Sequence, residues 1–250
     1  MSLDISNVLK DWPYEPGQLN VRLIVGEDDE PKIQMRIDLG VLQMETEGRP
    51  DGLRPEGHES LLELQEANLD GHIEEHGSEE GFSLDAEDCR LLREEAVQYY
   101  HRYISLLVLE DYEGVIRDTS RNLRLLDFCA KHAEREEDRN ILEQFRPYLI
   151  MMRARAMASQ ALDANEAKAA MLAIDDGLEQ IRAHFTEIGR AEGVDASNEA
   201  RLLNAMREAL APKLPVSQKD ELRQRLDQAI SQENYELAAI LRDELKLMRE

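Results

Sequence analysis

Near the start of the chain, hydrophobic and polar residues alternate with a period of two. The alternation is strict between Lys32 and Asp38, as in a strand with one solvent-exposed face. Apolar runs at 20–26 and 41–46 predict two further strands, and the acidic segment 26–31 predicts a hairpin turn. Residues 1–64 are therefore predicted to form a small β-rich region.

Two segments that follow lack a strong apolar pattern. Residues 47–58, EGRPDGLRPEGH, are rich in Gly, Pro and Asp, which favours ordered turns over regular elements. Residues 65–87 are acidic and poor in apolar side chains, and are predicted to form an acidic linker or a mobile loop.

From 88 to 211 the apolar residues recur at helical spacing, in runs near 91–107, 115–128, 141–162, 167–185 and 200–210. Pro147 should start or kink the third helix, because proline is tolerated only in the first turn. Pro212 and Pro215 should end the last one. The predicted fold class is α+β, mainly α, with a bundle of stacked helical hairpins as its middle part.

A weak internal repeat lies within this helical region. Val115-Ile116 is followed seven residues later by Asn122-Leu123, and Ala170-Met171 by Gly177-Leu178. The stretch LEDYEGVIRDTSRNLRLL resembles the second-helix signature of tetratricopeptide repeats. The offset here is 55 residues rather than about 34. This resemblance implies stacked antiparallel helix pairs with longer helices, and an unrelated helical bundle is the alternative.

Residues 217–250 contain two amphipathic helical stretches separated by a short turn at about 232–234. Ser217 is placed to cap the first stretch. A hairpin this small has too little core to be very stable alone, so its apolar face needs a partner, a second copy or the rest of the chain. Its apolar stripes and two neighbouring charges are the predicted partner contacts: Leu222, Leu226, Ile230, Tyr235, Ala238, Leu241, Arg242, Asp243 and Leu245.

The pattern L-x-x-x-L-x-x-A-I-x-x-x-N-Y-E-x-A-A-x-L-R-D-x-L, which begins at Leu222 and ends at Leu245, resembles the UVR motif of excinuclease subunits B and C. The resemblance implies a docking or dimerising helical hairpin, used in that family for protein association and in regulators of Clp-type ATPases. The resemblance does not by itself imply nuclease, helicase or ATPase activity. The order of β-rich head, helical middle and terminal hairpin also resembles a group of bacterial proteins, from which no activity is carried over.

The net charge of the chain argues against two classes of partner, nucleic acids and anionic membranes. The net charge is -23, and residues 1–87 contribute most of it, with 6 basic against 22 acidic side chains. Such a chain repels phosphate backbones and anionic lipids, so we expect no direct nucleic-acid or membrane binding. With neither a membrane-spanning stretch nor a signal peptide visible, the chain is expected to be cytoplasmic. Cys89 and Cys129 are expected to be buried, reduced thiols.

Catalytic, cofactor-binding and metal-binding residues are not assigned from the sequence. His72 and His76 have i, i+4 spacing, but flanking glycines favour a solvated linker over a metal site. The acidic pairs Glu94-Glu95 and Asp175-Asp176 are expected to face solvent. The turn-rich segment holds a set of four polar residues of interest: Arg49, Asp51, Arg54 and His58. The two arginines could bind an anionic ligand, but anchoring of the loop to nearby acids is favoured.

The sequence therefore predicts a non-enzymatic adaptor that docks to a protein partner, or to a second copy, through the hairpin at 217–250. Excision repair and Clp-type stress proteolysis remain open as pathways, and no cofactor is expected. The alternative hypothesis is a small-ligand binder or enzyme whose site lies between the β-rich head, at Arg49–His58, and the helices.

Overall fold

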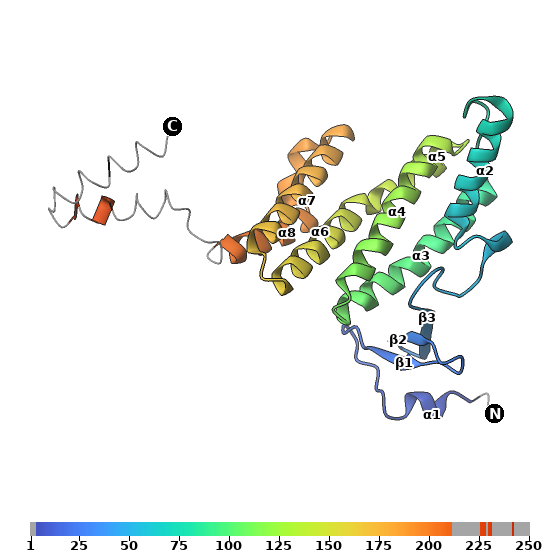
Figure 1. The fold of residues 1–250 in the computed structure, drawn as a ribbon, viewed down its shortest axis with the longest axis horizontal. Coiled ribbons are helices and arrows are strands. Elements are labelled where there is room, and N and C mark those ends of the chain that lie inside the picture. The colour runs from blue at the N-terminus through green and yellow to red at the C-terminus, as the bar shows by residue number, and fades with distance from the viewer. Residues whose placement is uncertain (1–3, 212–225, 229, 232–241, 243–250) are drawn as a thin grey trace. The chain divides into compact units, whose positions relative to one another are not determined.

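The computed structural model describes residues 4–211, 226–228, 230, 231 and 242 (Figure 1). The chain divides into two compact units, residues 1–207 and 208–250. The fold is α+β and mainly α, as predicted, with one small antiparallel sheet near the N-terminus. Among the described helices, none has the length and apolar character needed to cross a membrane.

The sheet confirms the three predicted strands, but the predicted solvent-exposed face of the central strand is wrong, because Lys32 and Gln34 on that face are each 6% exposed. Its order is β1 (Val21–Val25), β2 (Pro31–Ile37) and β3 (Gly40–Glu45). The register places Ile33 between Leu23 and Met44, on a face whose centre is fully buried. Strand β2 contacts helix α3 (Ala86–Val108), so the helices provide the core that a three-stranded sheet lacks by itself. A short helix, α1 (Ser6–Leu9), precedes the sheet.

The prediction of an acidic linker at 65–87 is wrong over its first half, because helix α2 (Leu61–His76) runs through it. The Ser60 side chain accepts a hydrogen bond from the Glu63 amide and caps the helix. Gly77, in the left-handed conformation, ends it. Gly71 lies inside the helix, where glycine costs only about 1 kcal/mol. The glycines that suggested a broken segment are thus one helix stop and one tolerated interior position.

Two long antiparallel helix pairs form the body of the first unit (Figure 1). Helix α3 pairs with α4 (Tyr112–His132), and α6 (Arg146–Asp163) pairs with α7 (Ala167–Glu187). Helix α4 packs against α6 and joins the two pairs. Shorter elements complete this part of the chain: η1 (Pro55–Gly57), α5 (Glu136–Asn140), η2 (Glu143–Phe145), η3 (Ala191–Ala196) and α8 (Asn198–Leu210).

The two pairs repeat each other at the offset of 55 residues found in the sequence. Each interhelical turn contains a residue with positive φ, Glu110 at 61° and Asn165 at 60°. In each turn the next amide donates to the carbonyl five residues earlier, from Asp111 to Leu106 and from Glu166 to Ala161. This hydrogen bond satisfies a carbonyl at the helix end. The repeated unit is therefore a helix–turn–helix hairpin.

Close packing between helices explains why Gly177 of α7 and Ala154 of α6 are small residues. A Cβ atom added at Gly177 would lie 2.5 Å from the Ala154 Cβ and 3.2 Å from Leu203 Cδ1. Helices α6, α7 and α8 thus meet at a point where no larger side chain fits. Pro147 lies in the first turn of α6, so it starts the helix as the sequence predicted.

Both cysteines are buried, which confirms that prediction, and both are 1% exposed. Burial raises the pKa of Cys89 to about 11 and that of Cys129 to about 12. Because the thiolate is the reactive form, we expect neither thiol to react with Ellman's reagent in the native protein at pH 8. Two thiols should react once guanidinium unfolds the chain. Rapid release of even one equivalent under native conditions would contradict this packing.

Candidate functional site

Side chains of the turn-rich loop after β3 contact the helices. The Arg49 guanidinium lies 3.5 Å from a Glu95 carboxylate oxygen and 3.1 Å from that of Asp51. Arg54 lies 3.5 Å from Glu59, and His58 is half-buried. These contacts favour the structural interpretation of Arg49, Asp51 and Arg54, whose charges are engaged with neighbours.

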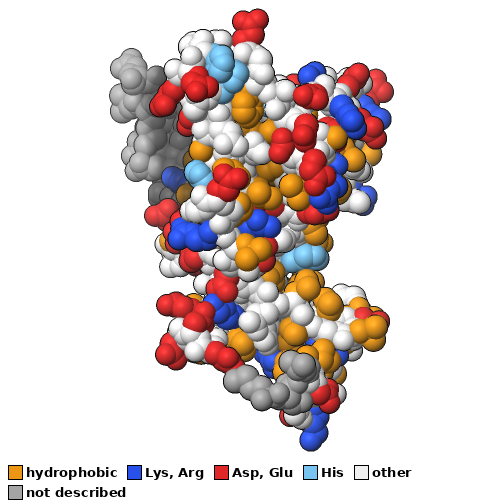
Figure 2. All heavy atoms as spheres, turned by 90° about the vertical axis from the view of Figure 1, so that its right-hand side faces the viewer, with side chains coloured by type: hydrophobic (Ala, Val, Ile, Leu, Met, Phe, Trp, Pro, Cys, Tyr) orange, Lys and Arg blue, Asp and Glu red, His pale blue; other side chains and the backbone are white. Residues whose placement is uncertain are grey.

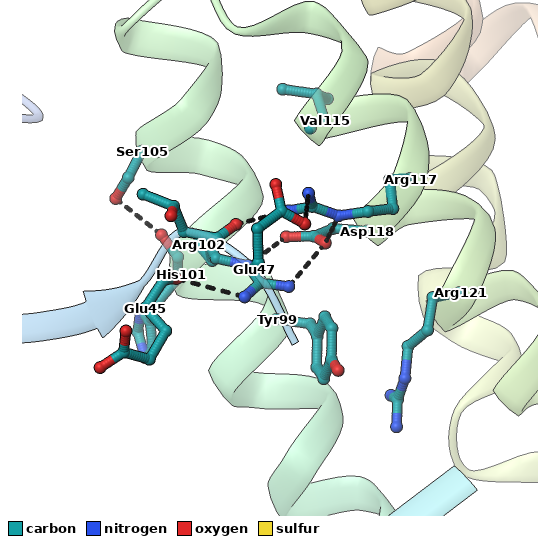
Figure 3. A network of polar contacts seen from close by, with 12 residues as sticks. Glu45, Glu47, Tyr99, His101, Arg102, Ser105, Val115, Arg117, Asp118 and Arg121 are labelled. Carbon is teal, nitrogen blue, oxygen red and sulfur yellow. Dashed lines mark hydrogen bonds and ion pairs between the residues drawn. The ribbon is translucent and has the colours of Figure 1, made fainter. Parts of the chain in front are cut away.

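The backbone of this loop is held by side chains of α3 and α4 (Figure 3). Arg102 donates to the Glu45 carbonyl at 3.2 Å, and Arg117 donates to the Thr46 carbonyl at 2.9 Å. The Tyr99 hydroxyl donates to the Gly48 carbonyl at 3.3 Å. Backbone carbonyls of an irregular loop need such donors when they leave water. We call this contact between the loop at 45–51 and helices α3 and α4 the head–helix joint.

At the centre of the joint, Arg102 and Asp118 form a bidentate ion pair across the α3–α4 hairpin (Figure 3). The two donor–acceptor distances are 2.7 and 2.8 Å, and the side chains are 1% and 0% exposed. Arg117 donates a further hydrogen bond to Asp118 at 3.0 Å. A buried charge is tolerated only when it is paired and hydrogen-bonded, and this pair meets both conditions.

A second buried carboxylate, Glu95, links three segments. It accepts hydrogen bonds from the amides of Leu61 and Leu62 at 2.7 and 3.4 Å, at the start of α2. Arg49 approaches it from the loop, and Arg121 of α4 forms an ion pair with it. The free amides and the dipole at a helix N-terminus favour a negative charge at this place. Glu95 therefore holds the loop, α2 and the α3–α4 hairpin together.

The expectation that Glu94-Glu95 faces solvent is correct for Glu94 and wrong for Glu95, which is 1% exposed. Sequence reasoning also missed Arg102 and Asp118. The sequence does hold a signal for these buried charges, namely their place among the apolar residues of each helix. Glu95 shares a helical stripe with Leu92 and Tyr99, and Asp118 lies between Val115 and Leu123 along α4. Charged residues on an apolar stripe indicate a buried polar joint.

His72 and His76 share one face of α2, where their rings stack with centroids 4.3 Å apart. The His72 ring contacts the Glu80 carbonyl at 3.0 Å, and the His76 ring contacts the His72 carbonyl at the same distance. Within the described part of the chain, no group of three or more His, Cys, Asp or Glu side chains is placed to hold a metal ion. The pair has local backbone partners instead.

Three surface pockets lie on the helical body, and none is lined by residues 49–58. A pocket of about 810 Å³ has charged side chains in its lining, among them Asp175, Arg182 and Arg207, and one of about 490 Å³ includes Asp70 and Lys131. A third, of about 450 Å³, is walled by apolar and aromatic side chains of α3, α4 and α6. The ligand site proposed between the head and the helices thus has no support from these pockets.

Of the nine predicted partner contacts, three belong to the part that the structure describes. Leu226 is half-buried, Ile230 is 51% exposed and Arg242 is exposed, and all three are helical. The Ser231 hydroxyl donates to the Gln228 carbonyl at 2.8 Å, as side chains do along a helix. The other six contacts lie outside the described residues: Leu222, Tyr235, Ala238, Leu241, Asp243 and Leu245.

Comparison with known proteins bears on the C-terminal segment. No curated protein and no solved structure matches the chain. The tetratricopeptide-like character of the helical middle therefore stays a prediction. One family model matches, that of the UvrB/UvrC motif, and it covers residues 217–250, the segment in which the sequence resembles the UVR hairpin.

Proposed function

We propose that this protein is a non-enzymatic adaptor that docks to a protein partner through the UvrB/UvrC motif at residues 217–250. The observation that carries the proposal is the match of this motif to a separate unit at the end of the chain. A motif shared by proteins of different activities supplies association rather than chemistry. The helical body and the acidic head then serve as further surfaces or as regulatory parts.

Apolar packing should drive the docking. Ile230 exposes half of its surface, and Leu226, four residues earlier, lies on the same helical face. Residues 218–250 carry 6 basic and 8 acidic side chains, so the motif is nearly neutral although the chain is strongly acidic. Affinity should therefore depend weakly on salt, because burial of apolar area does not respond to screening as ion pairs do.

The test uses the full-length chain, immobilised and offered purified excinuclease subunits, a Clp-type ATPase and a second copy of itself. Ile230→Asp should weaken binding to the true partner at least about 100-fold, because it places a charge in the apolar contact. Gln228→Asp is the matched control, since it adds the same charge at an exposed position nearby and should change affinity less than about threefold.

Deletion of 217–250 separates docking from folding. The shortened chain should lose the interaction and keep a cooperative thermal transition close to that of the full-length chain, because residues 1–207 form a unit of their own. Binding by the shortened chain would refute docking through the motif. Loss of the cooperative transition would assign the segment to the folded core instead.

A further inference from the structure

The outer edge of strand β1 is open, whereas the outer edge of β3 is covered where the strand ends, at Glu45. The Glu45 amide donates to the Pro50 carbonyl at 2.9 Å, and the Glu45 carbonyl accepts from Arg102 at 3.2 Å. No residue that the structure describes forms a hydrogen bond with the outward backbone groups of β1. Such an edge is a template for pairing with another strand.

The pairing with β2 shows which backbone groups of β1 point outward. The Gly26 amide donates to the Glu30 carbonyl at 2.7 Å, beyond one end of the strand. The Arg36 amide donates to the Asn20 carbonyl at 2.8 Å, beyond the other end. Hydrogen-bonded and non-hydrogen-bonded pairs alternate along an antiparallel ladder. The register therefore directs the N–H and C=O groups of three residues away from β2: Val21, Leu23 and Val25.

The side chains at this edge form an exposed apolar surface. Leu23 is 56% exposed and Val25 is 71% exposed, although Ile33, the neighbour of Leu23 on β2, is 0% exposed. Figure 2 shows hydrophobic side chains exposed on the head, at the lower end of the view. Proteins usually protect an open edge with a lysine, a proline or a bulge, and β1 has none of these. Its one charged residue, Arg22, donates to Gln34 at 2.8 Å.

The turn after β1 favours a basic partner. Glu27 and Glu30 are exposed and form no ion pair with any residue that the structure describes. A strand added antiparallel to β1 would place its N-terminal end beside this turn, where Lys or Arg would meet opposite charges. A second copy of the chain would instead bring together two heads, each with 22 acidic and 6 basic side chains in residues 1–87. Like charges therefore oppose self-pairing at this edge.

We propose that the outer edge of β1 binds an extended segment of a partner protein, in which Lys or Arg residues precede apolar residues that alternate with polar ones. The segment adds a strand antiparallel to β1, and its apolar side chains pack beside Leu23 and Val25. Main-chain hydrogen bonds hold the segment, and the acidic turn selects its charge. This surface is separate from the UvrB/UvrC motif and does not rest on the adaptor proposal.

The probe is the peptide KKKTVTVTV, labelled at its C-terminus with a fluorophore and added to the full-length protein. Fluorescence anisotropy should show saturable binding. An N-methyl group on the middle valine should weaken binding at least about tenfold, because the valines face Leu23 and Val25 and donate to β1. The same group on the threonine before it should change affinity less than about threefold, because that N–H points away from β1.

Two matched variants test the charge of the turn. Glu27→Gln/Glu30→Gln should weaken binding of the peptide about fivefold and reduce its dependence on salt, because two exposed charges beside the lysines are lost. Glu74→Gln/Glu75→Gln removes the same charge from exposed positions of α2, away from the sheet, and should change affinity less than about twofold (Figure 1).

Three results of the peptide experiments overturn the proposal: absence of saturable binding, equal effects of the two N-methyl groups, or equal losses in the two charge variants. Analytical ultracentrifugation tests the other occupant, a second copy. A dimer of the native chain that Leu23→Pro converts to a monomer would assign the edge to self-pairing and would also contradict the proposal, since proline removes an outward N–H. None of these results depends on the partner of the motif.

Discussion

Replacement of Asp118 by alanine is expected to lower the free energy of unfolding by about 3–5 kcal/mol. Asp118 is 0% exposed and accepts both hydrogen bonds of the Arg102 fork. Without the carboxylate, the guanidinium of Arg102 stays in the interior with no opposite charge beside it. Urea denaturation followed by circular dichroism would measure the loss from the transition midpoint.

The repeat within the chain provides the matched control. At the 55-residue offset, Arg102 and Asp118 correspond to Met157 and Ala173, so the second hairpin carries an apolar pair where the first carries an ion pair. The double variant Arg102→Met/Asp118→Ala should therefore be more stable than Asp118→Ala alone, because it removes the stranded charge. A double variant as unstable as the sum of the two single variants would show that the pair is not coupled.

This comparison also explains why the joint exists. Met157 is 40% exposed, whereas Arg102 is 1% exposed, because the loop after β3 covers only the first hairpin. The loop brings backbone carbonyls that need donors, and Arg102 and Arg117 supply them. Two hairpins of similar backbone thus differ in chemistry according to what covers them.

The regular elements could be predicted because their patterns are local. The alternation from Lys32 to Asp38 became the central strand, and Gly26 became part of the turn before it. Pro147 marked the start of α6 because it cannot lie deeper in a helix. Periodicity and breaker residues act within a few positions, so a single sequence exposes them.

Helix α2 was not predicted, because it depends on contacts between residues that are far apart in the sequence. Leu62 is the one residue of helix α2 that is fully buried, and the helix is also held by Glu95 at its start and by the ion pair between Glu66 and Arg124. The residues near Leu61 in the sequence do not indicate that a carboxylate 34 positions later accepts a hydrogen bond from the Leu61 amide. The acidic composition therefore suggested a linker, and tertiary contacts overrode it.

Exchange of Glu95 for glutamine should destabilise the protein by about 3 kcal/mol, although it only replaces one carboxylate oxygen by an NH2 group. The amide can still accept from the Leu61 backbone, but it cannot balance the positive charges of Arg49 and Arg121. Both arginines would then remain close together without a shared anion. Differential scanning calorimetry of the variant and the native chain would show the loss as a lower melting temperature.

Glu94→Gln is the internal control, because Glu94 is the neighbouring acid on the same helix, is exposed and pairs with Arg90 at the surface. Loss of an exposed ion pair should change stability by no more than about 0.5–1 kcal/mol. A local measurement separates the joint from a general loss of stability. In Glu95→Leu, which removes both acceptor oxygens, the amides of Leu61 and Leu62 should exchange with solvent faster relative to amides in α6 and α7. Equal acceleration across all three helices would mean that Glu95 supports the core as a whole and does not fasten α2.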